Sequence, residues 1–128
     1  MAKKIIIVDE DLDFLENTKV YLEKLGFEVL TTDTQKEAEE ILSKVMPDLA
    51  IFELMLENED SGFILCYKLR KLYPDVPIII ATAVSAETGI FFSLETEEEK
   101  KWIKADLYLE KEVTPEQLHK EILKLLKM

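Results

Sequence analysis

The sequence predicts one α/β domain over residues 1–128, built on a parallel five-stranded sheet with helices on both faces. Three observations point to this fold class. Short apolar runs alternate with longer stretches of helical period, which requires crossover connections and therefore parallel strands. No internal repeat or Ser/Gly-rich linker interrupts the alternation. A chain of 128 residues that is 48% apolar can bury one core and has no room for a second domain of ordinary size.

The five predicted strands are residues 5–8, 27–31, 49–52, 78–82 and 107–109. Residues 5–8 are apolar at every position, as expected of a strand buried on both faces. Residues 27–31 alternate apolar and polar side chains, which favours an edge strand that is half exposed.

Five helices are expected between and after these strands: 11–25, 34 to before Pro47, 62–73, 96–104, and 114 to the C-terminus. Capping boxes begin at Thr34, Thr96 and Thr114, where a hydroxyl and a carboxylate or amide can each satisfy an orphan backbone N–H. Gly26 follows the first helix, at a position that favours a residue without a Cβ.

Composition excludes several classes of function. The net charge of −11 argues against binding to nucleic acid or anionic membranes, since phosphate neutralisation needs clustered Lys and Arg. A single cysteine excludes an internal disulfide framework and a cysteine-based metal cage. The N-terminus is neither a signal peptide nor a membrane span, so a soluble cytoplasmic domain is expected.

Charged and hydroxyl side chains follow the predicted strands. Residues 9–11 are all acidic and follow the first strand, Glu53 follows the third, Thr82 ends the fourth and Lys111 follows the fifth. Ligands of parallel α/β sheets bind beyond the carboxyl ends of the strands, so these groups are expected to meet. Carboxylates that meet repel each other unless a metal cation or an ammonium group such as that of Lys111 neutralises them. Hard oxygen ligands suit Mg²⁺ or Mn²⁺ better than Zn²⁺.

Taken in order, the segments IIIVDED, PDLAIFELML, DSGF, PIIIATA and ADLYLEK resemble those of a two-component response-regulator receiver domain. The resemblance runs from Lys4 to the C-terminal helix. It implies the flavodoxin-like, doubly wound fold of the chemotaxis-regulator type, with strand order 2-1-3-4-5. It also implies a role in phosphorelay signalling as a switching and binding module, and not as an enzyme with turnover.

The resemblance also assigns a metal site. Asp9 and Glu10 match the acidic pair that binds the metal, Glu53 takes the phospho-acceptor position, and Met55 would offer its backbone carbonyl. The implied cofactor is Mg²⁺, with low occupancy or none expected in this chain.

Three further residues match the family's phosphoryl and switch positions. Thr82 matches the hydroxyl residue that contacts the phosphoryl group, and Lys111 matches the lysine that bridges to it. Tyr108 matches the aromatic residue whose rotation is coupled with Thr82. The implied partners are a sensor histidine kinase or another signalling protein, and an output partner on the face formed by helix 4, strand 5 and helix 5.

Glu53 is the main departure, because receivers carry the phospho-accepting Asp there. One added methylene moves the carboxylate toward the phosphoryl position, and a misplacement of about 1 Å can cost about a hundredfold in rate. The sequence therefore favours a pseudo-receiver in which Glu53 contacts Thr82 or Lys111 and signalling proceeds by protein contact. A competent Mg²⁺-dependent phospho-acceptor is the alternative, and a phosphatase-like enzyme is a distant one.

Residues outside the strand ends carry weaker signals. The apolar run 89–94 and Trp102 are expected to fold back over the core, with a partner-docking patch as the alternative. His119 is expected at the surface, and Cys66 as an apolar filler of the third helix.

Overall fold

The computed structural model describes residues 2–58, 61–82 and 105–128. Its elements are β1 (Lys4–Val8), α1 (Leu12–Lys24), β2 (Glu28–Thr32), α2 (Gln35–Lys44), β3 (Leu49–Phe52), α3 (Ser61–Leu72), β4 (Ile78–Thr82), β5 (Leu107–Glu110) and α6 (Pro115–Leu126). The five strands form one parallel sheet in the order β2-β1-β3-β4-β5, which confirms the predicted fold class and the edge position of the second strand.

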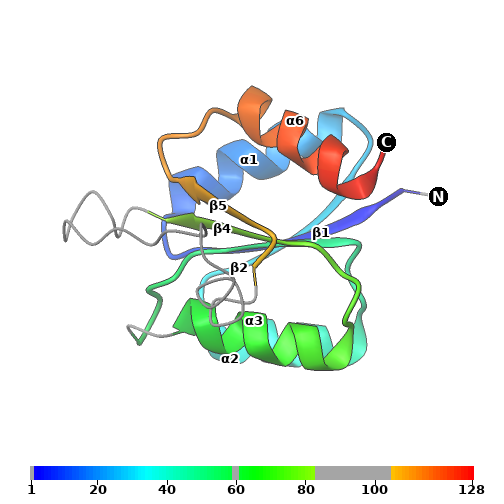
Figure 1. Cartoon of the computed structure of the whole chain (residues 1–128). Helices are drawn as coiled ribbons and strands as arrows, with labels where there is room; N and C mark the ends of the chain where they lie inside the picture. The colour runs from blue at the N-terminus through cyan, green and yellow to red at the C-terminus, as the bar shows by residue number, and fades with distance from the viewer. Residues whose placement is uncertain (1, 59–60, 83–104) are drawn as a thin grey trace.

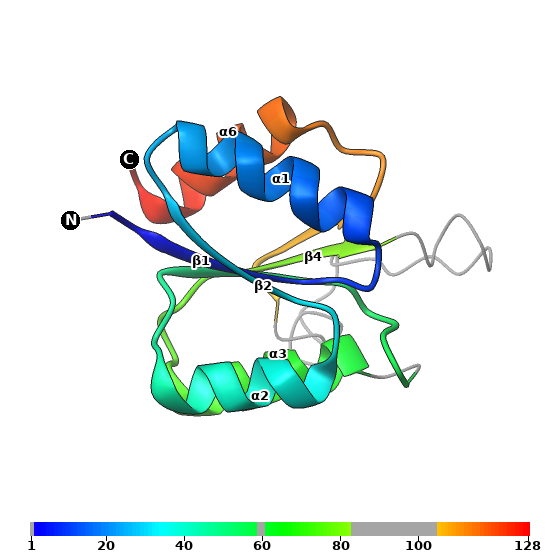
Figure 2. The same cartoon turned by 180° about the vertical axis from the view of Figure 1, so that it is seen from behind.

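The molecule has three layers. Helices α1 and α6 cover one face of the sheet, and α2 and α3 cover the other (Figures 1 and 2). Alternate residues of each strand enter opposite cores, because successive side chains of a strand point to opposite faces. Ile6 and Phe52 pack toward α2 and α3, while Ile5 and Ile51 pack toward α1 and α6. All four side chains are at most 1% exposed.

The observed element boundaries lie close to the predicted ones. Strands β3 and β4 have the predicted limits, whereas β2 lies one residue later because Glu28 pairs with Lys4 of β1. The predicted helix 96–104, the apolar run 89–94 and Trp102 lie outside the described residues. None of the helices in residues 2–58, 61–82 and 105–128 has the length and hydropathy of a membrane span.

The helix ends follow the sequence signals. Thr114 and Gln117 form a complete capping box, since each side chain accepts a hydrogen bond from the other's backbone N–H. At Thr34 the hydroxyl accepts from the Glu37 N–H at 3.1 Å. Gly26 follows α1 with a φ of +98°, a conformation that side-chain-bearing residues rarely adopt.

Two residues outside the strand ends have clear surroundings. Cys66 is fully buried in the core beneath α3, and burial raises the pKa of its thiol to about 12, which confirms its role as an apolar filler. His119 is only partly exposed, because its ring packs edge-on against Tyr21 and Phe27 at centroid distances of 6.3 and 6.1 Å.

Candidate functional site at the carboxyl ends of the strands

The carboxyl ends of four neighbouring strands bring the predicted groups to one edge of the sheet. Backbone hydrogen bonds fix their positions, from Glu53 N–H to the Val8 carbonyl at 2.9 Å and from Lys111 N–H to the Thr82 carbonyl at 3.0 Å. Because the hydrogen-bonded strands run parallel, Asp9, Glu53, Thr82 and Lys111 share this edge.

An ion pair between Asp9 and Lys111 occupies the centre of the site. Lys111 Nζ donates to Asp9 Oδ1 at 2.7 Å, and lies 3.6 Å from Asp11 Oδ2. The Asp9 side chain is 1% exposed and that of Lys111 is 17% exposed, so the pair is largely shielded from water. The Lys111 ammonium also lies 5.5 Å from the centroid of the Phe14 ring, which is within the range of a cation–π interaction.

Burial and charge shift the titration of both partners. Burial raises the pKa of Asp9, although the Lys111 ammonium and the Asp11 backbone N–H oppose that change. Burial works against the charge on Lys111, but its hydrogen bond to Asp9 and the surrounding carboxylates outweigh it and raise the pKa of the amine. Lys111 is therefore a permanently charged ammonium group at neutral pH.

Glu53 is held by different partners. Its Oε2 accepts from the backbone N–H of Leu54 at 2.8 Å, and the Thr82 hydroxyl also hydrogen-bonds to its carboxylate. Both residues are buried, Glu53 at 7% and Thr82 at 0% exposure. Burial and the nearby Asp9 charge raise the pKa of Glu53, against the opposing effects of the two hydrogen bonds and of Lys111. The Glu53 carboxylate is thus folded back against its own strand end and the end of β4.

Helix α3 packs directly against the backbone that carries Glu53. The Gly62 N–H donates to the Leu54 carbonyl at 2.7 Å, and a Cβ at Gly62 would lie 2.5 Å from both the Glu53 carbonyl oxygen and Leu54 Cα. Only a residue without a side chain permits this approach. This positioning role was not predicted from the sequence, although the DSGF segment places a glycine at the start of the third helix.

The donor set fits a hard divalent cation in part. Asp9 Oδ2 is buried and lacks a hydrogen-bond partner among the described residues, as expected of an oxygen reserved for a cation. Glu10 is exposed beside it, and Met55 is half-buried against the core. No group of three acidic, His or Cys side chains suited to a metal occurs in the described ranges. Mg²⁺ binds through one or two carboxylates and keeps several waters, so a small set of oxygen donors such as Asp9 and Glu10 suits it.

Tyr108 lies on β5, the edge strand that pairs with β4. Its side chain is half-buried, and burial together with the charges of Glu53 and Glu110 raises the pKa of its phenol to about 12. The phenol is therefore neutral at physiological pH, and it shares an electrostatic environment with Glu53.

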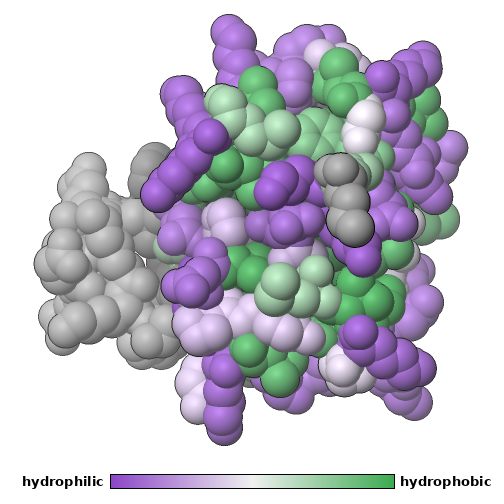
Figure 3. All heavy atoms as spheres, turned by 90° about the vertical axis from the view of Figure 1, so that its right-hand side faces the viewer, coloured by the Kyte–Doolittle hydropathy of each residue, from purple (hydrophilic) through white to green (hydrophobic). Residues whose placement is uncertain are grey.

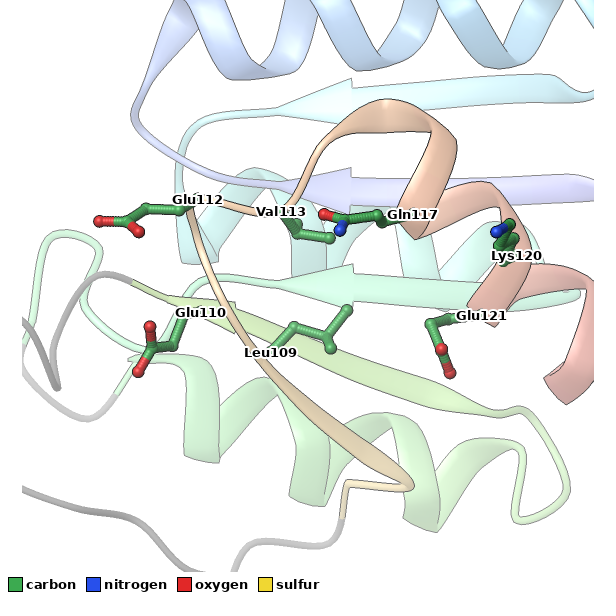
Figure 4. Close-up of a pocket in the computed structure, with 7 residues that line it drawn as sticks. All are labelled: Leu109, Glu110, Glu112, Val113, Gln117, Lys120 and Glu121. Atoms are coloured by element: carbon green, nitrogen blue, oxygen red, sulfur yellow. The ribbon is translucent and has the colours of Figure 1, made fainter.

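A groove of about 420 Å³ runs beside β5 and the start of α6 (Figure 4). It is lined by Leu109, Glu110, Glu112, Val113, Gln117, Lys120 and Glu121. Three glutamates, Gln117 and Lys120 make up its polar lining, and Leu109 and Val113 make up its aliphatic part.

The fold and the site define a class of parallel α/β protein with buried carboxylates and one lysine at the carboxyl ends of its strands. The family model of the response regulator receiver domain matches residues 5–123. The chain therefore belongs to the response regulator receiver domain family, whose members are signalling domains that interact with histidine kinases and output domains and typically bind Mg²⁺ at the phosphorylation site.

Relatives of known sequence agree with this assignment. The response regulator SaeR of Staphylococcus epidermidis is 31% identical over 114 residues, covering 89% of this chain and 46% of the relative. The probable transcriptional regulator ycf27 of Cyanophora paradoxa is 31% identical over 125 residues, covering 98% of this chain and 48% of the relative. The chain thus spans about half the length of these relatives.

Solved structures agree as well. A CheY-like response regulator receiver domain protein from Methanospirillum hungatei JF-1 matches with a TM-score of 0.83 and 31% identity, covering 99% of this chain and 95% of the other. The chemotaxis response regulator CheY4 of Vibrio cholerae matches in fold, with a TM-score of 0.81, 24% identity and coverage of 98% and 99%.

Proposed function

We propose that residues 1–128 form one receiver domain in a two-component system that signals by protein contact, with phosphoryl transfer to position 53 lost or strongly weakened. In this proposal Glu53 takes the position of the phospho-accepting Asp of receivers, as the motif resemblance implies. The side chains of the strand-end site keep one set of contacts and are not switched by phosphorylation. The domain has no enzymatic turnover.

The main support for this proposal is the orientation of the Glu53 side chain. Its carboxylate is engaged by Leu54 N–H and the Thr82 hydroxyl, while Lys111 is engaged by Asp9. A phosphoryl group on an acceptor carboxylate would use the same hydroxyl and ammonium groups. Glu53 thus already accepts the hydrogen bond of the Thr82 hydroxyl, as a phosphoryl oxygen would. Thr82 and Tyr108 would therefore be held toward one switch position without phosphorylation.

The metal plays a reduced part in this proposal. Asp9 and Glu10, with the Met55 carbonyl and Glu53, are the groups that would hold Mg²⁺, which neutralises charge during phosphoryl transfer when it is bound. Burial raises the pKa of both Asp9 and Glu53, which weakens binding of a cation that requires ionised carboxylates. Low occupancy is the expected result.

The output surface in this proposal is the face that includes β5 and the start of the last helix. The groove shown in Figure 4 supports a protein partner there, because an aliphatic floor surrounded by charged groups is typical of a docking surface. A sensor histidine kinase or another signalling protein in the cytoplasm is the expected partner, with neither nucleic acid nor membrane involved.

Incubation with acetyl phosphate and Mg²⁺, followed by intact mass spectrometry, tests the proposal. The wild-type chain should keep its mass under conditions that label an ordinary receiver run in parallel. A gain of one phosphoryl mass that is abolished by Glu53→Gln would overturn it.

The second candidate is a competent phospho-acceptor that uses Mg²⁺. It is favoured by the buried, unpartnered Asp9 Oδ2 and by the presence of both Thr82 and Lys111. Titration of Mg²⁺ monitored by Tyr108 or Trp102 fluorescence separates the two: saturable micromolar-to-millimolar binding that Asp9→Asn abolishes would favour the competent acceptor.

A further inference from the structure

A second pocket lies at the opposite edge of the sheet, where the strands begin. It is formed by the connections from α2 to β3 and from α3 to β4, has a volume of about 470 Å³, and is called here the amino-end pocket. Its lining residues are Met46, Pro47, Asp48, Leu72, Tyr73, Pro74, Asp75 and Val76. Figure 3 views this side of the molecule and shows apolar surface in the half where α2 and α3 end.

Two large apolar side chains of the amino-end pocket are exposed. Met46 is 57% exposed and Leu72 is 51% exposed, although each lies beside the buried core. They flank one concave site, and clustered exposed apolar side chains mark interaction surfaces more often than isolated ones do.

The walls of the pocket are fixed before any ligand arrives. The Arg70 guanidinium donates to the carbonyls of Pro74 and Val76 at 2.9 Å each, and the Tyr73 hydroxyl donates to the Leu42 carbonyl at 2.8 Å. Two prolines add further rigidity to the lining. A preformed pocket loses little conformational entropy when it is filled, which favours binding.

The charge of the lining selects the occupant. Two aspartates line the pocket and no Lys, Arg or His does. Asp48 already accepts the backbone N–H of Lys4 at 2.7 Å, whereas Asp75 is exposed at the rim. A second copy of this chain would bring its own net charge of −11, so self-association is electrostatically disfavoured.

We propose that the amino-end pocket docks a cationic protein segment, which places a large apolar side chain between Met46 and Leu72 and an adjacent Arg or Lys against Asp75. This surface is separate from the strand-end site and does not depend on whether Glu53 is phosphorylated. It would let the domain hold one partner at each end of the sheet.

The test uses the whole chain labelled with ¹⁵N and the tripeptide N-acetyl-Arg-Trp-Arg-amide as the probe. Saturable amide shifts should appear around Met46, Leu72 and Val76 at millimolar peptide. The peptides N-acetyl-Glu-Trp-Glu-amide and N-acetyl-Arg-Gly-Arg-amide should each bind much more weakly, since one lacks the cation and the other the apolar side chain.

Matched variants assign the interaction to the pocket. Asp75→Asn should weaken binding about two- to fivefold, as expected for one exposed charge pair, and Met46→Ser about tenfold. Leu25→Ser removes an apolar side chain of 46% exposure outside the pocket and should leave binding unchanged.

Three results would overturn the proposal. They are the absence of saturable shifts at the pocket, equal binding of the acidic tripeptide, and concentration-dependent shifts at the pocket without peptide. The last result would identify a second copy of the chain as the occupant.

Discussion

At the scale of single residues, the strand-end site holds several carboxylates close together, and the Lys111 ammonium offsets part of their mutual repulsion. Asp9 and Glu53 are both buried, and the charge of Asp9 adds to burial in raising the pKa of Glu53, while the Lys111 ammonium pairs with Asp9 and Asp11. The repulsion left at Glu53 costs stability whenever both carboxylates are ionised. Residual strain of this kind is common at functional sites.

Glu53→Gln tests that repulsion through the pH dependence of stability. A group whose folded pKa is raised contributes stability below its unfolded pKa, and loses that contribution as the pH rises through the folded pKa. Wild type should therefore lose stability relative to Glu53→Gln as the pH rises from about 4 toward 7. Urea unfolding at several pH values measures this, with the exposed Glu112→Gln as a control. A difference that is constant with pH would contradict the account.

Gly62 offers a second test at this scale, because two effects of opposite sign compete there. In an ordinary helix Gly→Ala stabilises by about 1 kcal/mol. At Gly62 the new Cβ would lie 2.5 Å from backbone atoms of Glu53 and Leu54, which cannot move without displacing the site. Gly62→Ala should destabilise by about 1–3 kcal/mol, the usual cost of overpacking. Chemical unfolding measures it, and unchanged or increased stability would show that α3 can move away from β3.

At the scale of elements, capping chemistry determines where the last helix begins. The box of Thr114 and Gln117 satisfies two backbone N–H groups directly after the loop that follows Lys111. Thr114→Ala should reduce the free energy of unfolding by about 1 kcal/mol, with Thr114→Ser nearly neutral. Thermal and urea unfolding both report it, and a loss as large for serine as for alanine would point to packing of the methyl group instead.

The sequence predicted strands and helix starts best where a few neighbouring residues are enough to determine them. The apolar run at 78–82 predicted a strand with its observed limits, and the capping box at Thr114 predicted where the last helix begins, because burial and hydrogen bonding act within a few residues. The surroundings of His119 were not predictable in that way, since Tyr21 and Phe27 come from distant segments. The site was also only partly predictable. The proximity of Asp9 and Lys111 follows from the strand topology, whereas the hydrogen bond between Thr82 and Glu53 depends on side-chain geometry.

At the scale of the whole molecule, the excess of acidic over basic residues lowers the stability of the folded state through charge repulsion. With a net charge of −11, like charges on the folded chain repel one another. The groove beside β5 and the amino-end pocket both carry more acidic than basic side chains. Raising the ionic strength from about 10 to 150 mM shortens the Debye length from roughly 30 to 8 Å and should stabilise the fold. Thermal unfolding across NaCl concentrations measures this, with KF as a check on specific ions. A melting temperature that falls with added salt would mean that attractive ion pairs dominate.

We attribute the proposed loss of phosphoryl transfer in this chain to the side-chain length at position 53. Glu53→Asp retracts the carboxylate by one methylene and leaves Asp9, Thr82 and Lys111 in place. The most direct measurement is the intact mass of this variant after acetyl phosphate and Mg²⁺. We expect Glu53→Asp to gain one phosphoryl group and wild type to gain none. Equal labelling of both, or labelling of wild type alone, would contradict it.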